Sequence, residues 1–181
     1  MENALMNKVN RVSRRLAMIL WVGAAIGTVF GIAVTLAALF RAELLRGWAN
    51  EAYPLAEGLT HPQIFMLVVL GLGQLALTVA ALCALARMFS SVAREEPLNL
   101  EASTLMRRAS GWLLAATIYA VAVQIPGSLV ASVHMPEGSR FISLALSSSH
   151  ASGVIAALVL FAVASIQELA AQVRDDNRQI I

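Results

Sequence analysis

The sequence has a single cysteine, Cys83, among its 181 residues. One cysteine cannot form a disulfide within the chain, and it cannot supply the C-x-x-C pairs that bind zinc. The motifs of nucleotide binding and hydrolysis are also missing, since there is no Walker A sequence, no G-x-S-x-G and no H-E-x-x-H. We therefore expect neither an enzyme nor a cofactor.

Four long stretches contain no Asp, Glu, Lys or Arg, and they run over residues 16–40, 63–86, 111–133 and 147–166. About 20 apolar residues, each rising about 1.5 Å in a helix, cross a hydrocarbon core of about 30 Å. The chain is 59% hydrophobic, whereas soluble domains contain about 45–50% apolar residues. We predict an all-α integral membrane protein, a four-helix transmembrane bundle that forms one domain over residues 1–181. The fourth span is expected to extend to residue 168.

The basic residues are distributed unevenly between the two ends of these spans. All but three of the 13 Lys and Arg residues lie before span one, between spans two and three, or after span four. The exceptions are Arg41, Arg46 and Arg140. Lys and Arg in short loops stay in the cytoplasm, so both termini should be cytoplasmic. The apolar region of a cleaved signal sequence has about 7–15 residues. The first apolar stretch is longer, so we expect it to be retained.

The spans lack the residues on which conduction or haem binding would depend. Ion and proton pathways use ionisable side chains within the membrane, and haem needs an axial ligand such as histidine inside the bundle. The histidines His61, His134 and His150 all fall at the end away from the basic clusters. Together with Met135 they are ligand types that suit copper, but their spacing matches no metal motif. We expect no metal, and whether the histidines form a site stays open.

Small residues predict close helix packing. Gly23, Gly27 and Gly31 recur every four residues and so share one face of span one. Such stripes let helices approach each other in lipid. We expect packing within the bundle, and the alternative is a homo-oligomer. Span two has a weaker stripe, at Ala76, Ala80 and Ala84, and span four has one at Ser149, Gly153 and Ala157.

Several local signals predict how the helices begin and end. After span one, apolar residues recur at helical spacing up to Pro54. This periodicity indicates a short amphipathic helix on the outer surface, or an extension of span one. Thr60 and Gln63 have the spacing of a capping box at the start of span two. Pro97 and Asn99 predict a helix break and a new helix cap before span three.

Span three contains two unusual residues within its apolar stretch. Pro126 should kink the helix, because proline removes a backbone hydrogen bond. Gln124 is expected to bond to a neighbour, for which Gln74 of span two is a candidate, and a polar pocket is the alternative interpretation.

Two cytoplasmic segments combine charge with structure. We predict that the loop before span three and the tail after span four form a docking surface for a soluble partner, with the residues Glu101, Arg107, Arg108, Arg174, Asp175, Asp176 and Asn177. In the alternative interpretation the arginines only attract anionic lipid, at about 1 kcal/mol each. That alternative does not explain the acidic tail.

The same segments, REEPLNLEASTLMRRASGW over residues 94–112 and RDDNRQII over residues 174–181, resemble the bacterial four-span family catalogued as domain-of-unknown-function family 2975. The chain departs from it at Leu98, where the family often has phenylalanine. The resemblance implies an inner-membrane protein without assigned activity. Genes of this family often neighbour genes for helix-turn-helix regulators, which implies a soluble regulatory partner.

We therefore expect a non-enzymatic interaction or regulatory protein of the inner membrane, with no direct binding of nucleic acid. The alternative is a small-solute or metal-binding membrane protein, or an oligomeric pore.

Overall fold

The computed structural model describes residues 2–56, 58–94, 100–136 and 138–179. Within these ranges the chain forms helices and no strands, which confirms the all-α prediction. The helices are α1 (Glu2–Phe40), α2 (Glu43–Ala52), α3 (His61–Val92), α4 (Leu100–Ala122), α5 (Gln124–Ser132) and α6 (Ser148–Gln179). Among the described residues, four segments are long and apolar enough to cross a membrane: Lys8–Phe40, His61–Val92, Leu100–Ser132 and Ser148–Arg174. The predicted four-helix, multi-pass architecture is confirmed.

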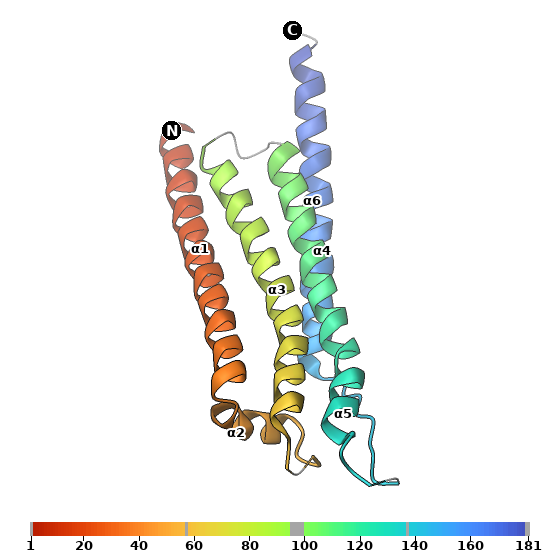
Figure 1. Cartoon of the computed structure of the whole chain (residues 1–181). Coiled ribbons are helices and arrows are strands. Elements are labelled where there is room, and N and C mark those ends of the chain that lie inside the picture. The colour runs from red at the N-terminus through yellow and green to blue at the C-terminus, as the bar shows by residue number, and fades with distance from the viewer. Residues whose placement is uncertain (1, 57, 95–99, 137, 180–181) are drawn as a thin grey trace.

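The four spanning segments contact one another in chain order (Figure 1). Helix α1 packs on α3, α3 on α4, and α4 on α6, whereas in the described part α1 contacts neither α4 nor α6. Each segment therefore keeps a broad apolar surface, on which Phe30 of α1 is 62% exposed and Ile155 of α6 is 61% exposed. Such surfaces suit contact with lipid tails, which are as apolar as these side chains.

The two ends of the chain lie at the same end of the bundle (Figure 1). We call this the basic end, and it comprises the start of α1, the end of α3, the start of α4 and the end of α6. Helix α1 is continuous from Glu2, so the basic residues before the first apolar stretch are helical as well. Helix α6 continues to Gln179 and projects beyond the start of α4 (Figure 1).

Two helices begin at the opposite end with the same kind of cap. At the start of α3, Gln63 Oε1 accepts hydrogen bonds from the backbone N–H of Thr60 at 2.8 Å and from its hydroxyl at 2.7 Å. At the start of α6, the backbone N–H of Ser147 donates to His150 Nδ1 at 3.1 Å. A side chain at the third helical position that reaches back in this way satisfies a backbone donor at the cap. The prediction for Thr60 and Gln63 is confirmed, and the role of His150 is new.

The third span is divided into α4 and α5 by Pro126. Proline has no backbone N–H, and its ring clashes with the carbonyl four residues earlier, which here belongs to Ala122. Helix α4 ends at that residue. The chain continues through hydrogen bonds from Val123 N–H to the Tyr119 carbonyl at 2.8 Å and from Gly127 N–H to the Val123 carbonyl at 3.0 Å. The helix is thus interrupted at Val123, one turn before the proline that predicts a kink.

Helix α2 lies across the opposite end, against the start of α3 (Figure 1). Its Ala49 is fully buried in a cluster that includes Ile64 of α3 and Ala131 of α5, while its Trp48 is 49% exposed. This confirms the predicted amphipathic helix. Because residues 41–42 separate it from α1, it is a surface helix and not an extension of the first span.

Candidate functional site

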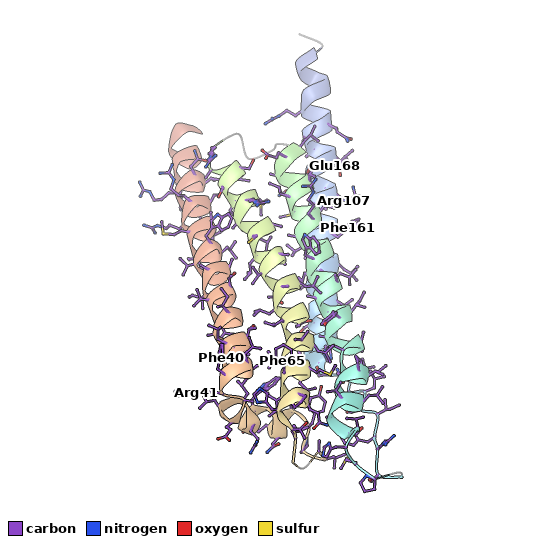
Figure 2. All side chains as sticks on the ribbon, in the orientation of Figure 1. Phe40, Arg41, Phe65, Arg107, Phe161 and Glu168 are labelled. Carbon is purple, nitrogen blue, oxygen red and sulfur yellow. The ribbon has the colours of Figure 1, made fainter. Side chains whose placement is uncertain are left out.

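Arg107 is held between two residues of α6 at the basic end. Its Nη1 lies 3.5 Å from Glu168 Oε2, and its guanidinium carbon lies 5.2 Å from the centre of the Phe161 ring (Figure 2). The side chains of the ion pair are 54% and 39% exposed, so the pair stabilises the fold by at most about 1 kcal/mol. Its main effect is to give the Arg107 charge a defined position beside α6.

Arg108 points to a different neighbour. Successive residues on a helix are about 100° apart, so this side chain lies on the α3 side of α4 while Arg107 faces α6. Arg108 and Arg87 of α3 line a common groove of about 720 Å³. Neither arginine forms an ion pair with a described residue.

Glu101 links the start of α4 to the end of α3. Its Oε2 accepts a hydrogen bond from the hydroxyl of Ser91 at 3.0 Å, and Ser91 is 8% exposed. The two ends of the α3–α4 connection are thereby tied together. The predicted break at Pro97 and the predicted cap at Asn99 lie outside the described residues.

The acidic tail continues α6 and does not fold back. Arg174, Asp175, Asp176 and Asn177 belong to its last turns, which project past α4 (Figure 1). The side chains of the last three lie outside the described part. Of the predicted docking residues of α4, Arg107 forms an ion pair with Glu168 of α6, a residue that the sequence analysis did not single out. Its position as a single acidic residue just after the apolar stretch could have indicated this role.

The glycine stripe of α1 faces α3 of the same chain. A Cβ added at Gly31 would lie 2.8 Å from Leu75 Cδ2, and one added at Gly27 would lie 3.1 Å from Val79 Cγ2. At Gly23 the nearest atom would be 3.9 Å away. The approach of the two helices is therefore closest at the end of the stripe nearest α2.

At the opposite end, an extended segment over residues 141–146 lies along α5. Side chains of α5 bond to every second residue of this segment: Ser132 to the Phe141 carbonyl at 3.3 Å, Ser128 to the Ser143 N–H at 3.0 Å, and Gln124 to the Ala145 N–H at 2.6 Å. Four helical residues rise about 6 Å, and two extended residues span about 6.6 Å. Four residues of α5 and two residues of the extended segment therefore advance by nearly the same distance. The polar side chains of α5 thus take the place of a neighbouring strand.

Gln124 uses both ends of its amide on this segment. Besides accepting the Ala145 N–H, it donates through Nε2 to the Ala145 carbonyl at 3.0 Å and to the Ala120 carbonyl at 3.2 Å. The expected pair with Gln74 is therefore wrong. Gln74 Oε1 is buried without a hydrogen-bond partner among the described residues.

Among the described residues, the three histidines have different local settings and are not bonded to one another. His134 Nδ1 is 2.9 Å from Gln63 Nε2, His150 caps α6, and His61 is the first residue of α3. In the described part of the chain, no three His, Cys, Asp or Glu side chains gather as metal ligands would. Two of these histidines therefore take part in local polar structure.

Tyr53 follows α2 and lies against α5. Its hydroxyl occupies the place that a Cβ at Gly127 would take, so a larger residue there would force the Tyr53 side chain to move. Burial raises the pKa of the Tyr53 phenol above its ordinary value of 10.0.

Comparison of the chain with protein-family models, with curated proteins and with solved structures finds no match. What the protein does must therefore be inferred from its own residues and their arrangement.

Proposed function

We propose that the chain is a non-enzymatic multi-pass protein of a bacterial inner membrane, with both termini in the cytoplasm. It acts by binding a soluble regulatory partner at the basic end. The resemblance of its charged segments to domain-of-unknown-function family 2975 belongs to the same proposal. The orientation is supported by the basic residues, which gather at the basic end as they do in cytoplasmic loops.

The observation that carries the proposal is exposed charge at this end that contacts neighbouring helices. Arg107 lies between Glu168 and Phe161, and Glu101 is bonded to Ser91. Charged side chains in defined positions favour a specific partner, because complementary charges fix orientation and exclude wrong partners. The helical end of α6 extends this surface away from the bundle (Figure 1).

The apolar stretches of the spanning segments contain far fewer ionisable side chains than the basic end. Residues 16–40, 63–86, 111–133 and 147–166 contain no Asp, Glu, Lys or Arg. Intramembrane pathways for ions and protons usually depend on such groups. An interaction at the membrane surface therefore fits the residues better than transport through the bundle.

The proposal is tested by purifying the full chain from cells in mild detergent and identifying bound proteins by mass spectrometry. Reversing one exposed charge, Arg107→Glu, should reduce recovery of the partner at least fivefold. The matched control is Arg46→Glu, which makes the same change on the exposed face of α2 at the opposite end. It should leave recovery unchanged.

Deletion of residues 174–181 tests the contribution of the tail. Partner recovery should fall while insertion and abundance of the protein stay at the wild-type level. Equal recovery from the wild type, Arg107→Glu and the deleted form would contradict binding at the basic end.

A further inference from the structure

A groove opens between α3 and α4 at the basic end, away from the contact of Arg107 with α6. Its volume of about 720 Å³ falls within the range of about 300–1,000 Å³ typical of ligand pockets. Small residues line it at a spacing of four on each helix, Ala80 and Ala84 on α3 and Gly111 and Ala115 on α4. A Cβ added at Gly111 would meet no atom of the surrounding structure within 4 Å. Here small residues leave open space instead of allowing close contact.

The two helices hold each other in place around this groove. At the basic end, Met88 of α3 and Met106 of α4 belong to one buried cluster. Nearer the opposite end, the hydroxyl of Tyr119 donates to the Leu70 carbonyl at 2.8 Å. The space between these contacts is therefore a fixed feature of the fold.

Two exposed arginines stand at the entrance of the groove. Arg87 and Arg108 line it from the two helices, and neither forms an ion pair with a described residue. Arginine stays protonated at any physiological pH. Its paired N–H donors match the oxygens of a phosphate group. The entrance is thus complementary to an anion.

The interior of the groove is apolar and runs into the spanning segments. From Arg87 to Ala80 and from Arg108 to Ala115 each helix advances two turns, about 10 Å at 1.5 Å per residue. A soluble protein cannot follow the groove into the hydrocarbon layer, whereas an acyl chain can. Trp112 also lines the groove and is 44% exposed, as suits a residue at the lipid–water interface.

We infer that this groove binds an anionic phospholipid, with its phosphate between Arg87 and Arg108 and an acyl chain along the small residues of α3 and α4. Charge complementarity selects the headgroup, and the apolar depth selects a lipid over a soluble anion. The site is separate from the pair of Arg107 and Glu168, which lies on the other side of α4. Arg108, which the sequence placed among the docking residues, is here assigned to the lipid.

The fluorescence of Trp112 gives a local measurement of binding. The full chain carrying Trp21→Phe and Trp48→Phe is reconstituted in phosphatidylcholine bilayers that contain increasing fractions of brominated phosphatidylglycerol. Bromine quenches tryptophan at short range, so a bound lipid should give saturable quenching. Brominated phosphatidylcholine should give only the quenching expected from its share of the bilayer.

Arg108→Gln should weaken the selectivity for phosphatidylglycerol about fivefold, and Arg87→Gln should do the same. Arg107→Gln is the matched control, because it removes the same charge from the neighbouring residue outside the groove. Gly111→Leu should abolish saturable quenching, because its side chain fills the groove while every charge remains. Gly71→Leu, at a glycine of α3 that lies outside the groove and where an added Cβ would also meet no atom within 4 Å, should have no effect.

Equal losses in Arg107→Gln and Arg108→Gln, with none in Gly111→Leu, would show general attraction of lipid and overturn the proposal. Equal quenching by the two brominated lipids would overturn it as well. Efficient disulfide crosslinking of two chains through Cys83, which lines the groove, would assign the space to a second copy. Elution of each variant as the wild-type species in size-exclusion chromatography establishes that the variants are folded.

Discussion

The side-chain amide of Gln124 bonds to both backbone groups of Ala145: Oε1 accepts the N–H at 2.6 Å and Nε2 donates to the carbonyl at 3.0 Å. The pairing holds an extended piece of chain beside α5, near the start of the fourth span. In apolar surroundings such backbone groups need partners within the protein. The Gln124 amide supplies them, since no described residue forms a neighbouring strand.

Replacing Gln124 by leucine should therefore destabilise the fold. The change removes the side-chain partner of the N–H and carbonyl of Ala145, and each such hydrogen bond contributes about 0.5–1.5 kcal/mol. Gln74→Leu is the matched control, since Gln74 Oε1 has no partner to lose among the described residues. We expect a lower thermal unfolding midpoint in detergent only for Gln124→Leu, with faster proteolysis between residues 138 and 147. Equal midpoints for the two variants would contradict the role of Gln124.

Gly31→Leu should separate α1 from α3. Even a Cβ at this position would lie 2.8 Å from Leu75 Cδ2, and overpacking of this kind costs about 1–3 kcal/mol. Gly47→Leu on α2 is the control, because that glycine has no neighbour within 4 Å. The measurement is thermal aggregation together with the size of crosslinked species. A lost dimer with unchanged monomer stability would mean that the stripe faces another copy.

Gly127→Ala should destabilise the opposite end, because the new methyl group would overlap the hydroxyl of Tyr53. Tyr53→Phe removes the oxygen and should restore part of the loss. A double-mutant cycle of unfolding free energies should give a coupling of about 1 kcal/mol or more between the two positions. Additive effects would show that Tyr53 and Gly127 do not touch.

Stability should also fall at alkaline pH through Tyr53. Burial raises its pKa above 10.0, so the folded state favours the neutral phenol. This contribution is complete below the unfolded pKa of about 10 and is lost as the pH rises through the folded pKa. Tyr53→Phe should lose less stability than the wild type between about pH 9 and 11. Parallel losses in both proteins would place the alkaline sensitivity elsewhere.

The sequence predicted what is local in this fold. Charge-free stretches gave the spans, the spacing of Thr60 and Gln63 gave a helix cap, and Pro126 gave the break between α4 and α5. The cap and the break depend on residues about one turn apart, and each span depends on one continuous stretch of the chain.

Relations between helices were harder to predict. The contact of Arg107 with Glu168 depends on how far α4 and α6 are shifted along each other, which no pattern within one helix encodes. Ala80 and Ala84 illustrate the same limit, because a small-residue stripe is compatible both with close packing and with an open groove. The partner of Gln124 lies in an extended segment that carries no periodic signal.

Photo-crosslinking in living bacterial cells tests most directly whether the chain acts through a soluble partner at its basic end. A photoreactive residue is placed at Glu101, and in a separate strain at Ser139 near the opposite end. The account predicts an adduct with a soluble cytoplasmic protein from position 101, lost on adding Arg107→Glu, and none from position 139. Adducts from position 139 alone, or the same adduct from both positions, would contradict it.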